Sequence, residues 1–348
     1  MLRDALIGQA ATWQRLMADL EANRVPHALM LCGPAGSGKL ALALAFAEAL
    51  LCQHPHEDGS ACGECTSCRM AAKLEHPDLH FTFPFVKGTR IKNAEDAIAD
   101  HYIKEWRARV LQSPYFDLND WLDDIDAGNS QATYYVAEAD NIQRKLALKA
   151  NQGGRKVMVV WLPEKMNQET ANKLLKLFEE PPAETHFLMV SEEPDLVLGT
   201  ILSRTQQMLV PPLPREEYVR AHSPKDERLM LDLFIMLMRL SYQRKVKDLR
   251  EWADQLAGMG RESQKGFLQF CQRQVRENFV FNFRQPELND QSADEAAFSN
   301  NFARFINERN VIPISEELAK AETDIAQNVN ARMVFFDLAL KMIVLLIQ

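Results

Sequence analysis

The chain has 348 residues, of which 47% are hydrophobic and 25% are charged, and its formal net charge at pH 7 is −8. These values are ordinary for a globular protein of more than one domain, and the acidic balance argues against a generally basic nucleic-acid binder. The N-terminal residues lack the long apolar run of a secretory signal, so we expect a cytoplasmic protein without a membrane partner.

The first patterned elements surround a glycine-rich loop at residues 33–39, with the sequence GPAGSGK. The spacing of apolar residues predicts an amphipathic helix over 10–22, an apolar strand over 28–32 and a helix over 40–51. A strand, a glycine-rich loop and a helix in this order are the setting in which the pattern GxxxxGK binds phosphate.

The loop predicts a degenerate nucleotide site for ATP or ADP. Backbone N–H groups and the start of the following helix would face the anion, and the lysine would reach its outer phosphates. The motif requires Ser or Thr at the next position to hold Mg²⁺, and this chain has Leu40. Nucleotide binding therefore stays open. The candidate nucleotide-binding residues are Gly33, Gly36, Gly38 and Lys39.

Four cysteines with the spacing C-x9-C-x2-C-x2-C follow the loop and its helix. Four thiolates can close a tetrahedron around Zn²⁺ and leave no open position, which predicts a structural zinc knuckle over residues 52–80. An iron–sulfur cluster or four unrelated thiols are the alternatives. The candidate ligands are Cys52, Cys62, Cys65 and Cys68.

Residues 84–130 carry several aromatic side chains among many charges and no catalytic pattern. We expect an inserted subdomain with its own small core, and a partner-docking surface is the alternative. Beyond it, helices are predicted over 136–150 and 169–180, and buried strands over 156–162 and 187–190. Strands that alternate with helices predict an α/β domain with a mostly parallel sheet, which we place at residues 1–210.

The remainder of the chain has a helical pattern. Residues 211–226, rich in proline and charge, are expected to form a linker or a shortened lid, and residues 227–348 an all-α domain. The apolar run at 333–347 is shorter than the ~20 residues that a membrane span needs, so a buried helix is expected there. Helical patterns run over 229–240, 266–278, 296–308 and 332–347.

Taken in order, several motifs resemble the clamp-loader branch of the AAA+ ATPases, and in particular the clamp-loader subunits of bacterial DNA polymerase III. The resemblance implies an α/β P-loop AAA+ domain with a zinc knuckle, a three-helix lid and an all-α collar domain. Whether the lid is absent or lies outside this sequence stays open. Besides the loop and the cysteines, the matching segments are LIGQ at 6–9, PHA at 26–28, TANKLLKLFEEPP at 170–182 and ILSRT at 201–205.

The departures from the family pattern imply that the chain has no ATPase activity of its own. In active members the strand that ends near residue 161 finishes in Asp-Glu, which orient Mg²⁺ and the attacking water. Here these positions are Trp161 and Leu162, and Leu40 has replaced the metal-binding hydroxyl. Phosphoryl transfer depends on placing metal and water, so we expect hydrolysis to be lost. The nearby Glu164 is a displaced candidate for the missing acid.

The resemblance also implies a role for Arg204. In the family a Ser-Arg-Cys triplet supplies an arginine finger to the ATP of the neighbouring subunit, and this chain has Ser203-Arg204-Thr205. A locally paired surface arginine is the alternative. The implied partners are motor subunits of the gamma/tau type, the delta subunit, and through the complex the sliding clamp and primed DNA.

Two other functions were weighed against a non-catalytic loader subunit. An active motor subunit of the same family would need the Asp-Glu pair that is missing at residues 161–162. A zinc-dependent nucleic-acid-binding module would need basic residues on the knuckle, whereas residues 52–80 contain more acidic than basic side chains.

Overall fold

The computed structural model describes residues 2–88, 90–127, 130–151, 154–214, 217–218 and 224–347. Contacts between Cα atoms divide the chain into two compact units, which we call the N-terminal unit (Met1–His222) and the C-terminal unit (Ser223–Gln348). The predicted linker at 211–226 lies partly outside the described residues. Within it, helix α10 begins at Pro224.

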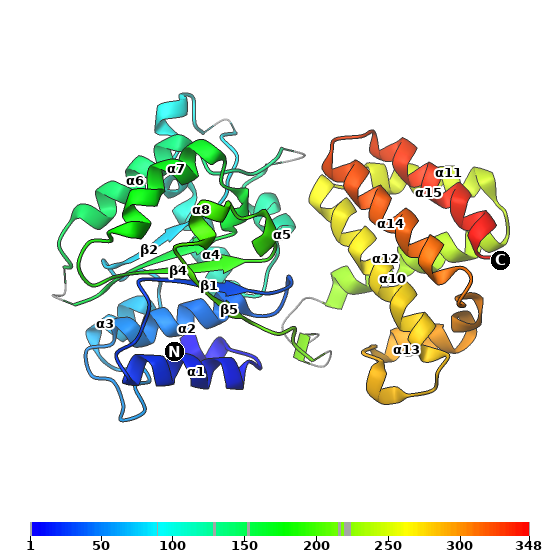
Figure 1. Cartoon of the computed structure of the whole chain (residues 1–348). Helices are drawn as coiled ribbons and strands as arrows, with labels where there is room; N and C mark the ends of the chain where they lie inside the picture. The colour runs from blue at the N-terminus through cyan, green and yellow to red at the C-terminus, as the bar shows by residue number, and fades with distance from the viewer. Residues whose placement is uncertain are drawn as a thin grey trace. The chain divides into compact units, whose positions relative to one another are not determined.

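The N-terminal unit is built around a five-stranded sheet in the order β2-β3-β4-β1-β5, with every neighbouring pair parallel (Figure 1). The predicted strands are confirmed, whereas the two edge strands, β2 and β5, were not anticipated. The strands are β1 (Ala28–Cys32), β2 (Leu79–Thr82), β3 (Lys156–Trp161), β4 (Thr185–Ser191) and β5 (Gln206–Leu209).

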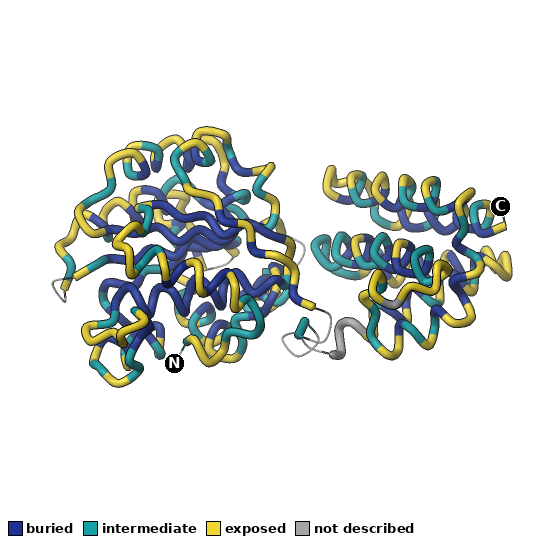
Figure 2. Tube along the Cα trace, turned by 60° about the horizontal axis from the view of Figure 1, so that its bottom comes forward, coloured by how far each residue is buried: buried dark blue, intermediate teal, exposed yellow. Residues whose placement is uncertain are grey.

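Helices cover both faces of this sheet, with α6 and α7 on one side and α1, α2 and α3 on the other (Figure 1). Alternate side chains of each strand enter two different cores: Leu29 and Leu31 of β1 pack with α2, and Met30 packs with α6 and α7. Burial on both faces explains why the strands are continuously apolar (Figure 2). The helices are α1 (Ala10–Glu21), α2 (Lys39–Leu51), α3 (Thr66–Ala71), α6 (Val136–Ala147), α7 (Gln168–Glu179) and α8 (Gly199–Leu202).

The segment 84–130 forms two further helices, α4 (Ile103–Gln112) and α5 (Leu118–Asp124). The expectation of a separate small core is wrong, because the aromatic residues of this segment join the core of the sheet. The rings of Trp106 and Phe116 lie 5.2 and 5.1 Å from that of Trp161, at the end of β3. The segment and the sheet therefore share one core.

The C-terminal unit is all helical, as expected, with α12 packed along α14 and α11 along α15. Its core surrounds Trp252, whose indole N–H donates to the carbonyl oxygen of Leu233 over 3.1 Å. None of the helices in the described part of the chain combines the length and hydrophobicity of a membrane span. The helices are α10 (Pro224–Tyr242), α11 (Val246–Ala257), α12 (Arg261–Phe281), α13 (Ala293–Phe302), α14 (Val311–Ala326) and α15 (Ala331–Leu345).

The helix predicted over 296–308 is shorter in the structure. Helix α13 ends at Phe302 and a 3-10 turn follows at Ala303–Phe305. The side-chain amide of Asn282, the residue after α12, donates to the carbonyl oxygens of Ala303 and Ile306, each over 2.9 Å. In a longer helix these carbonyl oxygens would accept hydrogen bonds from the backbone of the next turn. The helices α11 and α14 were not anticipated from the sequence.

Candidate functional site

The phosphate loop lies between β1 and α2, where the sequence predicts it. Its glycines are needed for its shape: Gly36 and Gly38 have φ of 74° and 80°, in the left-handed region. A Cβ at Gly33 would lie 2.2 Å from the carbonyl oxygen of Val210. The loop therefore keeps the backbone conformation that its glycine pattern encodes.

The lysine of the loop is turned into the protein. Lys39 is 3% exposed, and its Nζ donates to the carbonyl oxygen of Pro34 over 2.5 Å and to Oγ of Ser37 over 3.1 Å. Burial lowers the pKa of Lys39, with nearby Glu192 and Glu164 opposing the shift. The ammonium group that a nucleotide would need is already bonded within the loop.

Tyr115, from the segment between α4 and α5, closes over the loop. Its ring carbon Cε1 lies 3.0 Å from where a Cβ of Gly38 would stand. Its hydroxyl accepts a hydrogen bond of 2.6 Å from the backbone N–H of Ile7. The side chain is buried with Ala41 and Leu213. Tyr115 thus ties the N-terminal segment to the loop, a contact that nothing in the sequence signals.

The three positions at which the family resemblance implies missing catalytic groups are all in the core. Leu40 is 4%, Trp161 2% and Leu162 1% exposed. Leu162 also has a φ of 56°, which is costly for a leucine and is held by the surrounding packing. The end of β3 is therefore an apolar, tightly packed region.

Glu164, the candidate for the missing acid, belongs to the 3-10 turn Pro163–Lys165 after β3, and its side chain reaches the end of β4. Its Oε1 accepts hydrogen bonds from the backbone N–H groups of Glu192 and Glu193, over 2.8 and 3.2 Å. Burial raises the pKa of Glu192 to about 7, with Lys39 opposing the shift and Glu164 adding to it. The carboxylate of Glu164 thus caps the backbone that follows β4, and both acids favour the charged form of Lys39.

The four cysteines come together at the other end of α2. Cys52 follows the last residue of this helix, and Cys65 caps the start of α3. Each Sγ atom lies within 4.8 Å of the others, and the Cys52–Cys62 and Cys62–Cys68 sulfur pairs are 3.6 and 4.0 Å apart. Zinc–sulfur bonds of about 2.3 Å in a tetrahedron require sulfurs roughly 3.8 Å apart. The donor set fits a tetrahedral metal ion.

Backbone N–H groups support this arrangement by pointing at the sulfurs. The N–H of Cys62 donates to Sγ of Cys52 over 3.3 Å, and the N–H groups of Cys65 and Cys68 donate to Sγ of Cys62 and Cys65 over 3.4 Å each. Such bonds favour the thiolate form that a metal binds. The two other cysteines, Cys32 and Cys271, are buried and take no part.

Arg204 lies just beyond α8, with its side chain 31% exposed. It forms an ion pair with Glu179, the last residue of α7. Its Nη1 donates to the carbonyl oxygen of Thr200 over 2.8 Å and to Oγ of Ser203 over 3.1 Å. The predicted finger is thus at the surface and is held by its own chain, far in sequence from the phosphate loop.

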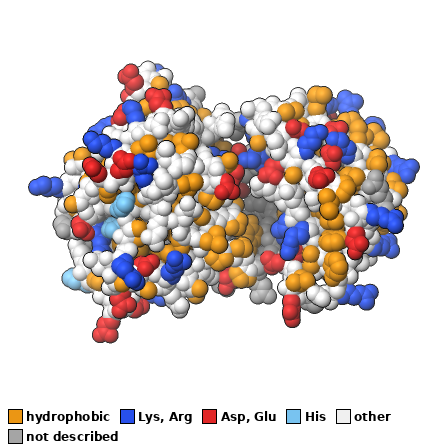
Figure 3. Space-filling model, viewed as in Figure 1, with side chains coloured by type: hydrophobic (Ala, Val, Ile, Leu, Met, Phe, Trp, Pro, Cys, Tyr) orange, Lys and Arg blue, Asp and Glu red, His pale blue; other side chains and the backbone are white. Residues whose placement is uncertain are grey.

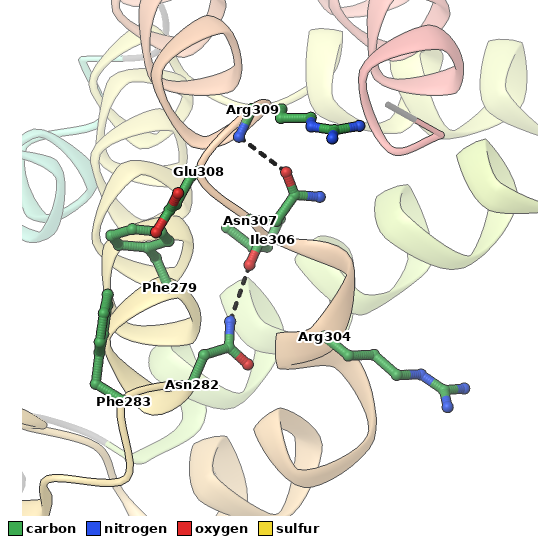
Figure 4. A pocket seen from close by; sticks show the side chains of 8 residues that line it. All are labelled: Phe279, Asn282, Phe283, Arg304, Ile306, Asn307, Glu308 and Arg309. Atoms are coloured by element: carbon green, nitrogen blue, oxygen red, sulfur yellow. Dashed lines mark hydrogen bonds between the residues drawn. The ribbon is translucent and has the colours of Figure 1, made fainter.

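The C-terminal unit contains a hollow of about 480 Å³ between α12 and the 3-10 turn after α13 (Figure 4). Asn282 and Asn307 face its centre and are engaged in hydrogen bonds with backbone atoms. The side chains of Arg304 and Arg309 extend away from these two residues. No group of titratable side chains converges there among the described residues that line it, and we assign it no role.

On the face of the molecule shown in Figure 3, acidic and basic side chains are interspersed over both units. The described residues of this face form no broad basic surface of the kind that tracks a nucleic-acid backbone.

A family model described as "DNA polymerase III, delta subunit" matches residues 8–214, more than half of the chain. The DNA polymerase III subunit delta' of Pseudomonas aeruginosa is 33% identical over 203 residues, which cover 58% of this chain and 48% of that protein. The same subunit of Escherichia coli is 29% identical over 229 residues, covering 66% and 55%. A DNA polymerase III subunit tau/gamma from Haemophilus influenzae is 25% identical over 281 residues, covering 80% and 32%.

The chain thus spans about half the length of the curated delta' relatives it matches. Among solved structures, a gamma subunit-related protein of Thermotoga maritima aligns with 96% of this chain and 98% of its own, at a TM-score of 0.38 and 13% identity. That similarity is too low to carry an argument, so the fold rests on the sheet, the loop and the helices described above. The family model alone covers enough of the sequence to decide the relationship, and the chain belongs to the DNA polymerase III delta subunit family.

Proposed function

We propose that this chain is a non-hydrolysing, delta-prime-type subunit of the DNA polymerase III clamp loader. It supports the loader ring and presents Arg204 to the ATP bound by a neighbouring subunit. One observation carries the proposal: the positions that need a hydroxyl and two carboxylates hold buried Leu40, Trp161 and Leu162, while Arg204 stays at the surface. The chain gives up hydrolysis and keeps the group that acts on another subunit.

The proposed partners follow from the relatives. Proteins named delta' and tau/gamma subunits align with this chain, and clamp-loader subunits work as one assembly. The chain would therefore bind motor subunits of the gamma/tau type and a delta subunit, and would meet the sliding clamp and primed DNA through the complex. The all-α C-terminal unit is the proposed collar that joins these subunits.

The phosphate loop serves a structural role in this proposal. Lys39 is bonded to Pro34 and Ser37, and Tyr115 packs on Gly38. ATP or ADP would have to displace both contacts and would find no hydroxyl at position 40 to hold Mg²⁺. We therefore expect weak nucleotide binding at most.

The four cysteines are proposed to hold one structural Zn²⁺. All four ligand positions are thiols, so no position is left for water, and the ion would not activate a nucleophile. It would fasten the knuckle to the end of α2. Thiolates kept as metal ligands agree with a reducing compartment, the cytoplasm.

The proposal is tested by assembling the chain with motor and delta subunits and measuring ATP turnover on primed DNA with the clamp. Arg204→Ala is expected to slow the ATP site that faces it by ~10³, the value of an arginine finger. Assembly, followed by native mass, should be unchanged. Arg144→Ala, at an exposed arginine of α6, is the matched control. Unchanged turnover in the Arg204→Ala complex, or loader-rate hydrolysis by the isolated chain, would contradict the proposal.

A further inference from the structure

The guanidinium of Arg204 makes four hydrogen bonds to three residues of its own chain. Its Nε donates to Oε1 of Glu179 over 2.8 Å, and Nη2 donates to the same oxygen. The Nη1 bonds to Thr200 and Ser203 anchor the other edge of the guanidinium. Four of its five N–H donors are thus assigned among the described residues, and one N–H of Nη2 is left to face a ligand.

The residues that bond to the two edges of the guanidinium come from different elements. Thr200 and Ser203 belong to the turn of α8 that carries Arg204 itself, whereas Glu179 ends α7. Only Glu179 supplies a charge, and only Glu179 fixes the guanidinium relative to the rest of the domain. Without it, the guanidinium would be held only on its Nη1 edge, by the turn that carries Arg204 itself.

Glu179 is itself placed by a rigid support. The preceding residue, Phe178, is buried and packs edge-on against Phe187 of β4, with ring centroids 5.0 Å apart. Nε2 of His27 donates to the carbonyl oxygen of Phe178 over 2.9 Å. The start of α7 is capped by Asn167, whose side chain accepts from the N–H of Thr170. Glu179 therefore belongs to a helix end that packs against β4 and is hydrogen-bonded to His27, the residue before β1.

Both partners remain accessible. The side chain of Glu179 is 47% exposed and that of Arg204 31%. An ion pair this open contributes little net stability, so little is lost when a phosphate replaces part of it. A guanidinium already oriented loses less freedom when the phosphate arrives.

We propose that Glu179 is the positioning residue of the arginine finger, orienting Arg204 before it meets the γ-phosphate of the neighbouring subunit. This inference rests on the function proposed above. The carboxylate touches no substrate. It acts through Arg204, and the reaction it serves is phosphoryl transfer at the neighbour's ATP.

The test uses the assembled complex and the part of its ATP turnover that depends on Arg204, defined as the difference between the wild type and Arg204→Ala. Glu179→Gln is expected to reduce the kcat of this part ~10- to 100-fold, the penalty of a misplaced group, with KM for ATP unchanged. Glu179→Asp, which keeps the charge on a shorter side chain, should restore part of it. Glu180→Gln removes the same charge from the exposed next residue and should have no effect.

The outcomes separate the inference from the proposed function. If Arg204→Ala lowers turnover but Glu179→Gln does not, or raises it, the positioning role is overturned and the finger stands. If Arg204→Ala has no effect, both are overturned. An equal loss from Glu180→Gln would mean that charge at the end of α7, and not the contact with Arg204, is responsible, which also overturns the inference.

Discussion

The phosphate loop and the surface around Arg204 differ in how far their cationic side chains are exposed. Lys39 is 3% exposed and bonds to its own loop, and Tyr115 packs on the neighbouring Gly38. Arg204 is 31% exposed and is oriented by a carboxylate that is more open still. The phosphate loop encloses its cation, whereas Arg204 lies at the surface. Under the proposed function, this difference separates a former nucleotide site from a group available to a partner.

The largest expected effect comes from restoring the lost acids. Trp161→Asp combined with Leu162→Glu places two carboxylates in an apolar core, where unpaired charges are costly. We expect the N-terminal unit to lose more than about 4 kcal/mol of stability and to gain no hydrolysis. Urea unfolding followed by circular dichroism measures the loss.

Leu196→Asp is the matched control for these substitutions, because Leu196 is 61% exposed, and it should cost less than about 0.5 kcal/mol. A double variant as stable as the wild type and able to hydrolyse ATP would show that the loop lacked only its acids, and the comparison above would fail.

A smaller effect is expected at Tyr115. Tyr115→Ala removes a buried ring and should lower the free energy of unfolding by about 3 kcal/mol. Tyr115→Phe keeps the ring and leaves the N–H of Ile7 without its acceptor, so it should cost about 1 kcal/mol. Thermal unfolding of the two variants separates packing from hydrogen bonding. Equal, negligible losses would mean that Tyr115 only rests on the loop.

A pH dependence of stability is expected from Glu192, which interacts with Lys39 of the loop. The pKa of Glu192 is raised to about 7, so the folded unit binds its proton more tightly than the unfolded chain does. The resulting stability is fully present below pH ~4.5 and is lost as the pH rises through about 7. We expect the free energy of unfolding, measured by urea denaturation, to fall by about 1 to 3 kcal/mol over this window. Glu192→Gln should remove this dependence of the free energy of unfolding on pH. An unchanged dependence would mean that another group is responsible.

The smallest effect is expected from nucleotide. A ligand that binds the folded state raises the melting temperature by mass action. Because Lys39 and Gly38 are already in contact with protein atoms, millimolar Mg-ATP should shift the melting temperature by less than about 1 °C. Differential scanning fluorimetry of the purified chain measures this. A rise of several degrees would show that the loop still binds nucleotide. The comparison between an enclosed Lys39 and an accessible Arg204 would then fail.

Much of the N-terminal unit could be predicted because its signals are local. The strand and helix around the loop follow from apolar runs and glycine positions, and the buried state of Trp161 and Leu162 follows from their place at the end of an apolar strand. The cysteine spacing also placed four sulfurs near one another before the fold was known. In each case the residues that decide the outcome are close together in the chain.

The missed features depend on contacts between distant segments. Tyr115 reaches Ile7 across 108 positions of sequence, and Arg204 reaches Glu179 across 25. No periodicity records such pairs. The core shared by residues 84–130 and Trp161 was missed for the same reason. Edge strand β5 was overlooked because three of its four residues are exposed and its pattern is weakly apolar.

The bonds of Lys39 to Pro34 and Ser37 bear on how this sequence changes through evolution. A lysine that stabilises its own turn serves the shape of the loop whether or not the loop binds nucleotide. The glycines around it, which meet backbone and aromatic neighbours, are needed for that shape in the same way. A lineage can therefore carry an intact GxxxxGK pattern for reasons unrelated to ATP. A genome survey that counts ATPases by this pattern will count such chains as well, unless it also inspects the end of the third strand.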